Sequence, residues 1–243
     1  MSLILSLETS TSVCSVALHD GGRVLACLEL HQDQSHASKL AVLIKQVMET
    51  AGKDFKMLSA VAVSSGPGSY TGLRIGTSTA KGLCYTLSIP LLACNTLEIM
   101  ASEVNNMNVT KALCCPMIDA RRMEVYCYIL DAKNNVVQPL EARVIDESSF
   151  LALLETNQVL FFGNGSAKCK EMIQHENAVF ISGIYPSAAQ LGILAHSKFR
   201  EGMYEDLVTF EPLYLKEFLI KQSLKVKANE QTGSNFVLSI NDG

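Results

Sequence analysis

The stretch SLILSLETSTSVCSVALHDGGRVLACLELH, residues 2–31, decides the fold of this chain. Its segments 2–8 and 12–19 are apolar and have the pattern of strands. The glycine pair at 21–22 supplies the positive φ angles that a tight hairpin needs, and residues 23–31 continue as a further strand. The stretch therefore predicts a three-stranded antiparallel meander.

The pattern that follows the meander adds helices and further strands. Apolar residues recur at helical spacing over 36–51 and end at Gly52, and the strand 59–65 leads through a glycine-rich loop into a helix over 72–87. This half therefore has the order βββαβα. The second half repeats it, with predicted strands at 110–118, 124–131, 136–146 and 158–163 and helices at 147–156 and 166–175. Each half closes with a strand and a helix, at 90–94 and 95–104 and again at 178–182 and 187–201.

This duplicated order points to a fold class. It repeats at a spacing of about 110 residues, with negligible sequence identity between the halves. It resembles the actin, sugar-kinase and Hsp70 nucleotide-binding superfamily (ASKHA), in which two such halves face each other across a cleft. We therefore expect a two-lobed, actin-like α/β fold of the ribonuclease H-like type. The lobes are expected at 1–105 and 106–215, followed by a loosely held polar tail at 216–243.

The composition excludes several classes of protein. With 48% hydrophobic and 18% charged residues and a mean hydropathy of +0.21, the 243-residue chain is neither disordered nor a low-complexity scaffold. Its net charge of −4 argues against direct binding of nucleic acid, which depends on clustered Lys and Arg. The first residues have neither the basic region of a signal peptide nor a membrane-spanning length of apolar sequence. We therefore expect a cytoplasmic protein without a membrane contact.

The spacing of the cysteines and histidines predicts neither disulfides nor a metal site. The eight cysteines lie inside apolar runs and never form CxxC, so we expect buried, reduced thiols. His31 and His36 are five residues apart across a strand-to-helix junction and lack the i, i+4 spacing of a helical metal site. No bound metal is expected.

The glycine-rich loop SSGPGSYTGLRIG, residues 64–76, is the segment best suited to carry chemistry. Backbone amides at the start of the following helix could cradle an anion, although no P-loop register fits, and the loop equally fits a tight turn with no ligand. Active members of the superfamily carry an Asp-x-Gly phosphate loop at the first hairpin. Here a serine side chain stands at that glycine position, so ATP hydrolysis is not expected. The phosphate-loop-like residues are Glu8, Thr9, Ser10, Gly66, Gly68 and Ser69.

Small residues form a stripe on the helix over 72–87, at Gly72, Gly76 and Ala80. Such a stripe allows the close approach of a neighbour, which is either another part of this chain or a partner subunit. Under the second interpretation, this helix and the helix at 36–51 form a pairing surface. The predicted pairing residues are Leu40, Ile44, Val47, Gly72, Arg74, Ile75, Gly76, Thr79, Ala80 and Leu83.

The turn IDARRMEVY, residues 118–126, places four charges between two predicted strands. A turn with this charge either lies in solvent or lines the cleft between the lobes, where Asp119 and Arg121 would pair. No Ser-His-Asp, Cys-His or paired-carboxylate set is recognisable, so no catalytic residue is predicted.

Taken together, these segments resemble the TsaB (YeaZ) family of the bacterial tRNA threonylcarbamoyladenosine machinery. The glycine loop combined with IDAR is highly specific, and the blocks occur in the family's order. The resemblance weakens after residue 126, and the family pattern does not cover the tail. The matching blocks are ILSLETSTSVCSVAL at 4–18, His36 before an amphipathic helix, SSGPGSYTGLRIG at 64–76, NTLEIMA at 95–101, IDARRMEVY at 118–126 and EPLYLK at 211–216.

The resemblance implies a non-catalytic relative of TsaD, the transferase that places the threonylcarbamoyl group on N6 of the adenosine beside the anticodon. Such a chain pairs with a TsaD-type subunit, or with itself in isolation, through the helices of its N-terminal half. A TsaE-type ATPase joins the complex, and tRNA is contacted only indirectly. No cofactor is implied, although a nucleotide at the subunit junction stays open. The alternative is a stand-alone sugar-kinase-like or peptidase-like enzyme that uses the interlobe cleft around Glu8, Gly66 to Gly68 and Asp119.

Overall fold

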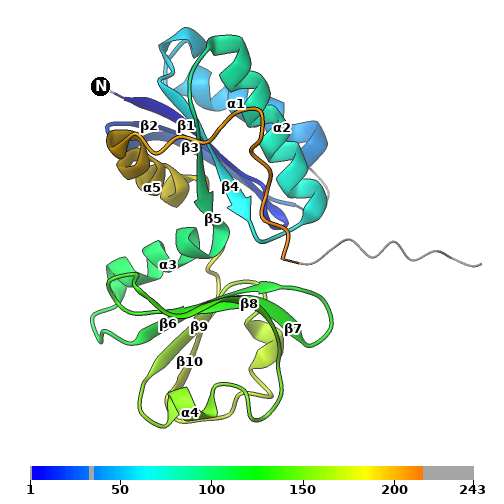
Figure 1. The fold of residues 1–243 in the computed structure, drawn as a ribbon. Coiled ribbons are helices and arrows are strands. Elements are labelled where there is room, and N and C mark those ends of the chain that lie inside the picture. The colour runs from blue at the N-terminus through cyan, green and yellow to red at the C-terminus, as the bar shows by residue number, and fades with distance from the viewer. Residues whose placement is uncertain (1, 33–35, 216–243) are drawn as a thin grey trace, which may run out of the picture.

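The computed structural model describes residues 2–32 and 36–215. Two five-stranded sheets form its two lobes (Figure 1). The first sheet contains β1 (Leu3–Glu8), β2 (Val13–Asp20), β3 (Arg23–His31), β4 (Ala60–Gly66) and β5 (Leu91–Asn95). The second contains β6 (Leu113–Asp119), β7 (Glu124–Leu130), β8 (Val136–Val144), β9 (Val159–Phe162) and β10 (Ala178–Ile181).

The two sheets share one topology. The strand order is β3-β2-β1-β4-β5 in the first sheet and, read in the same sense, β8-β7-β6-β9-β10 in the second. In the first sheet, β1 is antiparallel to β2 and parallel to β4. In the second, β6 is antiparallel to β7 and parallel to β9. The predicted two-lobed, actin-like α/β fold with a duplicated strand order is confirmed.

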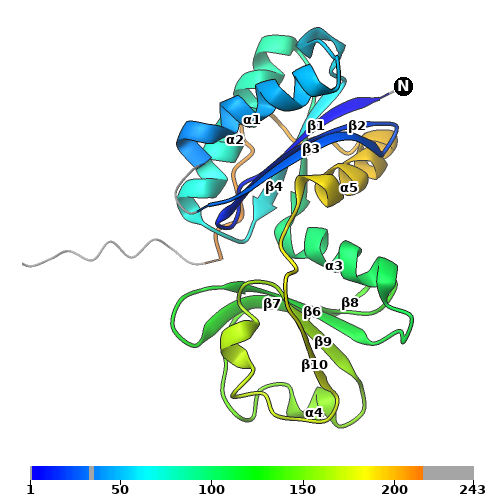
Figure 2. The same ribbon diagram turned by 180° about the vertical axis from the view of Figure 1, so that it is seen from behind.

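Helices cover both faces of the first sheet. On one face lie α1 (His36–Thr50) and α2 (Tyr70–Leu87), with a short 3-10 turn at Phe55–Met57 between them. On the other face lies α5 (Ala188–Glu201), as Figure 2 shows from behind. Strands covered on both faces are expected to be largely apolar, which is the pattern of β1 and β2, whereas β3 at the sheet edge stays partly exposed.

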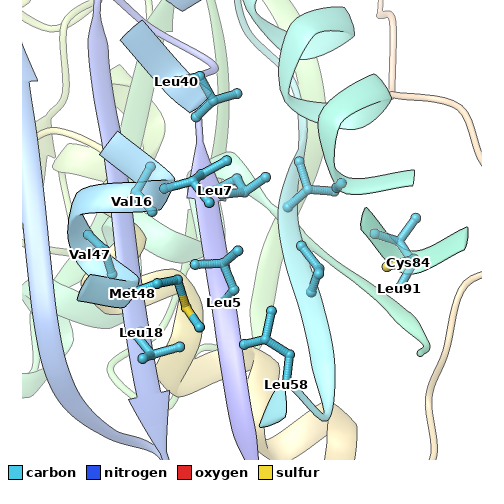
Figure 3. Close-up of a cluster of buried hydrophobic side chains, with 14 of the residues drawn as sticks. Leu5, Leu7, Val16, Leu18, Leu40, Val47, Met48, Leu58, Cys84 and Leu91 are labelled. Carbon is cyan, nitrogen blue, oxygen red and sulfur yellow. The ribbon is translucent and has the colours of Figure 1, made fainter. Parts of the chain in front are cut away.

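Strand β1 sits at the centre of this packing. Leu5 and Leu7 point toward α1, whereas Ile4 belongs to the cluster on the α5 side. Figure 3 shows the α1 side of the core, where Leu40 and Met48 meet side chains from β1 and β2. Burial of one such leucine contributes about 1.5–3 kcal/mol, so the position of α1 is set mainly by this apolar contact.

The last helix of each half lies on the sheet of the other half. The first half ends in α3 (Thr96–Met107), which packs against β6, and the second half ends in α5, which packs against β1 and β2. The far face of the second sheet is covered by the irregular segment 145–175, through residues such as Phe150 and Cys169. The division at 105 and 106 stays a prediction, and the predicted tail lies outside the described residues.

Two predicted helices in the second half were wrong. The helix predicted at 147–156 is only α4 (Leu151–Leu154), because Asp146 caps a tight turn and Phe150 has a φ of +66° in the left-handed region. The helix predicted at 166–175 is a 3-10 turn at Ala167–Cys169 followed by further turns. These short turns still carry apolar side chains onto the sheet.

None of the helices within residues 2–32 and 36–215 has the length and apolar character needed to cross a membrane.

Candidate functional site

The glycine loop and the first hairpin turn meet at the carboxyl ends of β1 and β4. The Ser69 backbone N–H donates a hydrogen bond of 2.6 Å to the Ser10 carbonyl oxygen. The Thr9 hydroxyl donates one of 2.8 Å to the carbonyl oxygen of Gly72, in the first turn of α2. The turn between β1 and β2 therefore rests directly on the start of α2.

Glycine is required wherever this turn touches α2. A Cβ atom at Gly68 would overlap the Ser10 backbone, and one at Gly72 would overlap the Thr9 carbonyl oxygen. A Cβ atom at Gly76 would overlap the Thr9 hydroxyl. The glycines of the loop are thus explained by close packing within the chain.

This packing occupies the place where a phosphate would approach the helix. Ser69 is the N-cap of α2, and its hydroxyl accepts a hydrogen bond of 3.3 Å from the Gly72 N–H. The Ser69 N–H is itself bound to the Ser10 carbonyl oxygen. The Ser69 and Gly72 amides at the start of α2 are therefore engaged inside the protein and are not free for an anion.

A second segment covers the loop from the other side. The C-terminal strap, which we define as residues 202–215, runs along α2, and the Leu213 N–H donates to the Ser65 carbonyl oxygen at 2.7 Å. Gly66 has a φ of +100°, and a Cβ atom there would lie 2.8 Å from the Leu213 carbonyl oxygen. Lys81 fixes the strap by donating to the carbonyl oxygens of Val208 and Phe210 at 3.2 and 3.1 Å.

Glu8 lies at the end of β1 and is 0% exposed. One carboxylate oxygen accepts a hydrogen bond of 2.6 Å from the Ser10 N–H, and the other has no protein partner. Burial raises the pKa of the Glu8 carboxyl, and the hydrogen bonds from Ser10 oppose this rise. Glu8 therefore holds the hairpin turn in shape and has no access to a substrate in this conformation.

The second lobe repeats the arrangement with different side chains. The Asp119 N–H donates to the side-chain oxygen of Asn164 at 3.1 Å, and a Cβ atom at Gly165 would lie 2.8 Å from the Ile118 carbonyl carbon. The glycine loop after β9 thus supports the turn after β6, as the loop after β4 supports the turn after β1.

Asp119 pairs with Lys168 and not with the Arg121 side chain. The Lys168 ammonium group forms an ion pair with Asp119 and donates to the carbonyl oxygens of Arg122 and Glu124 at 2.6 and 2.7 Å. Arg121 contributes its backbone N–H to Asp119 at 2.9 Å. The predicted pairing of the two side chains is therefore corrected. Lys168 was missed because 49 residues separate it from Asp119.

Comparison with known proteins identifies the family. A family model described as TsaD, tRNA N6-adenosine threonylcarbamoyltransferase, matches residues 23–222. The tRNA threonylcarbamoyladenosine biosynthesis protein TsaB of Bacillus subtilis is 32% identical over 77% of this chain and 81% of its own length. The chain belongs to the TsaB family. TsaB of Escherichia coli is 29% identical over 88% of this chain and 94% of its own length.

A solved structure supports the same relationship. A crystal structure described as an uncharacterized protein with similarity to peptidase YEAZ from Pseudomonas aeruginosa superposes with a TM-score of 0.78. That protein is 26% identical and covers 89% of this chain and 100% of its own length. The fold of this TsaB-family chain is therefore shared along nearly all of its described residues.

The structure divides the predicted pairing residues of this TsaB-family chain into two groups. Arg74 is exposed on α2 beside the strap, whereas Ile75, Thr79 and Leu83 are half-buried, and Ile75 and Leu83 pack in part against the core. The others are buried, because α1 packs on β1 and β2 and the small-residue stripe packs on Thr9. Leu40, Ile44, Val47, Gly72, Gly76 and Ala80 are buried within the single chain, and their part in pairing stays a prediction.

The cysteine thiols and the histidine side chains of the TsaB-family chain lie in different parts of the fold. All eight cysteines are free, and seven are buried while Cys27 is half-buried. Burial raises the pKa of Cys14 and of Cys84 to about 11. His31 lies 3.6 Å from Glu29 at the surface, whereas His36 is buried on α1. Within the described part of the chain, no three His, Cys, Asp or Glu side chains gather as metal ligands.

Proposed function

We propose that this chain acts in tRNA threonylcarbamoyladenosine biosynthesis as a non-catalytic subunit that pairs with a TsaD-type transferase and activates it. The names of its relatives support the pathway. The observation that carries the non-catalytic role is the Glu8–Thr11 turn, which fills the approach to the start of α2 and leaves Glu8 fully buried. A chain whose phosphate-loop region is closed in this way contributes a surface to the complex.

The proposed pairing surface is the outer side of α2. Arg74, Ile75, Thr79 and Leu83 lie there, and the buried stripe behind them fixes α2 against the hairpin turn. In isolation, the chain would use the same surface to form a homodimer, and a TsaE-type ATPase would join the complex with the transferase. The net charge of −4 favours tRNA contact through the partner.

Reconstitution tests this proposal. A TsaD-type transferase, its threonylcarbamoyl-adenylate substrate and tRNA are combined with and without this chain, and the modified nucleoside is measured. Modification is expected only when both proteins are present. Hydrolysis of ATP or transfer of the threonylcarbamoyl group by this chain alone would contradict the non-catalytic role.

A matched pair of charge reversals tests the pairing surface. Arg74→Glu changes the outer side of α2, whereas Arg200→Glu changes an exposed arginine on α5, on the opposite face of the first sheet. We expect Arg74→Glu to weaken pairing at least tenfold, equivalent to about 1.4 kcal/mol. Arg200→Glu should leave the affinity unchanged. Equal effects of the two variants would place the surface elsewhere.

The alternative of a stand-alone enzyme gains no support from these side chains. Glu8 is closed off from solvent, Gly66 to Gly68 lie between the hairpin turn and the strap, and Asp119 is engaged by Lys168. The word peptidase occurs in the description of one related structure. Hydrolysis of a peptide or phosphorylation of a sugar by the isolated chain would support this alternative.

A further inference from the structure

A shallow apolar groove on the outer side of α2 has no occupant among the described residues. Its volume is about 500 Å³. Phe55 lies at one end of it, and Leu83 and Leu87 form part of its wall. The groove includes two residues of the proposed pairing surface. It is lined mainly by Phe55, Thr79, Gly82, Leu83, Thr86 and Leu87.

Gly82 forms an open notch in this groove. A Cβ atom at Gly82 would meet nothing within 4 Å, whereas a Cβ atom at Gly72 or Gly76 would overlap the hairpin turn. Packing within the described chain therefore does not require glycine at this position. Glycine inside a helix is less stable than alanine, so Gly82 lowers the stability of α2 while keeping the notch open.

The rest of the chain leaves the described structure beside this groove. Tyr214, near the end of the strap, packs against Tyr70 with the ring centroids 4.8 Å apart and accepts a hydrogen bond from Arg74. Ser78 lines both the groove and the neighbouring hollow between α2 and the strap. The described chain therefore ends at a hollow that shares Ser78 with the groove.

The sequence of residues 216–243 contains one apolar run that suits the groove. Most of this segment is polar, but residues 236–240 read FVLSI. The family model ends at residue 222, so this run lies outside the matched region. The residues on either side of Phe55 carry both signs of charge, Asp54 and Lys56, so the fit of this run to the groove rests on its apolar side chains.

The connecting length also fits. Residues 216–235 form a linker of 20 residues, and a flexible chain of this length has a root-mean-square end-to-end distance of about 25 Å. Arg74 and Leu83 are about 14 Å apart along α2 at the rise of an α-helix. The average length of the linker exceeds this span, so the run can reach the groove, and a short flexible linker gives a tethered segment an effective concentration in the millimolar range.

We propose that the run Phe236–Ile240 binds in the groove beside Gly82 of the same chain. It covers Thr79 and Leu83, and therefore competes with the pairing subunit for the outer side of α2. The competition rests on the proposed function, whereas occupation of the groove does not. If the run covers the groove in about nine of ten molecules, the apparent affinity for the partner falls about tenfold.

Tryptophan fluorescence tests occupation of the groove without a partner. The chain has no tryptophan, so Phe236→Trp in the full chain gives a single reporter, and Ser234→Trp gives a matched control outside the run. We expect emission at shorter wavelength from Phe236→Trp than from Ser234→Trp. Identical solvent-like emission from both variants would overturn the proposal. A shift that grows with protein concentration would place the run in a second copy and would also overturn it.

A second substitution locates the bound run. Gly82→Leu fills the notch, while Ser197→Leu adds the same side chain at an exposed position of α5 on the opposite face of the sheet. Adding Gly82→Leu to Phe236→Trp should move the emission to longer wavelength, and adding Ser197→Leu should not. A shift that survives Gly82→Leu would show that the run binds elsewhere and would overturn the proposal.

The competition is measured with the TsaD-type subunit. Phe236→Asp should release the run and raise the apparent affinity about tenfold, while Ser234→Asp, which adds the same charge outside the run, should not. If neither the unsubstituted chain nor the Phe236→Asp variant binds the transferase, the proposed function fails while the fluorescence result still stands. If Phe236→Asp binds the transferase with the same affinity as the unsubstituted chain, the run does not compete, and this part of the proposal is overturned.

Discussion

The substitution Gly76→Leu probes how the hairpin turn and α2 hold each other. Gly76 faces Thr9, which is fully buried, and a Cβ atom at Gly76 would overlap the Thr9 hydroxyl and lie 3.5 Å from a methyl group of Val63. Both neighbours belong to the packed centre of the first lobe. A leucine therefore has no free space at this position.

The expected loss of stability follows from three contributions. Overpacking a filled core costs about 1–3 kcal/mol, and displacing Thr9 from the Gly72 carbonyl oxygen costs about 1 kcal/mol more. Replacing a glycine within a helix by a residue with a side chain raises the free energy of unfolding by about 0.5–1 kcal/mol. The net loss is about 1–3 kcal/mol. In a chain of this size each kcal/mol changes Tm by about 2–4 °C, so Tm should fall by about 2–12 °C.

Gly82→Leu is the matched control because it makes the same change six residues later on the same helix. Its side chain meets no described atom within 4 Å, so Tm should change by less than it does for Gly76→Leu. Thermal unfolding of both variants is followed by circular dichroism, and binding to the transferase is measured on the folded fraction. An unchanged Tm for Gly76→Leu together with a selective loss of pairing would refute the internal role of the stripe.

Three further predictions concern titratable groups. Burial raises the pKa of Glu8 above 4.5, so ionisation of Glu8 lowers the free energy of unfolding of the unsubstituted chain as pH rises above 4.5. Urea unfolding should therefore show that Glu8→Gln becomes more stable relative to the unsubstituted chain from pH 4.5 upward. Burial lowers the pKa of His19, whose ring bonds to the Ala189 carbonyl oxygen at 2.9 Å. Stability should therefore fall as pH drops below about 6.5, and hydrogen exchange should show α5 loosening first; equal protection of all helices would contradict this. Cys27 should be the first thiol that iodoacetamide labels in the native protein, as measured by peptide mass analysis, because the other seven are buried; earlier labelling of any of those seven would count against the described burial.

The regular elements were predictable because their patterns are local. The apolar run over 12–19 indicates a buried strand and the helical spacing over 36–51 indicates a helix with one buried face, and β2 and α1 lie there. The segment 147–175 was mispredicted because short turns that cover a sheet also place apolar residues at three- and four-residue intervals. Ile145, Phe150 and Cys169 reach the core from such turns.

The candidate site was predictable only in part. The sequence grouped Ser10 with Gly66, Gly68 and Ser69 as phosphate-loop-like residues, and the structure brings Ser10 against this loop. It left open what the stripe at Gly72 and Gly76 packs against, because small residues allow close approach without specifying the neighbour. The contact with Thr9 depends on the three-dimensional path of the turn. The ion pair of Lys168 with Asp119 was not predicted because the two residues are 49 positions apart in the sequence.

The exchange of α3 and α5 between the sheets makes the two halves mutually dependent. A fragment ending at residue 107 would lack α5 and would expose the face of the first sheet that carries Ile4 and Leu92. The complementary fragment would lack α3, which covers β6. Expressed separately, each piece should aggregate, whereas co-expressed pieces cut at 108–112 should reassemble into one particle. Each sheet is therefore completed by a helix from the other half, so a rearrangement that removed either half would leave the remaining sheet with an uncovered apolar face.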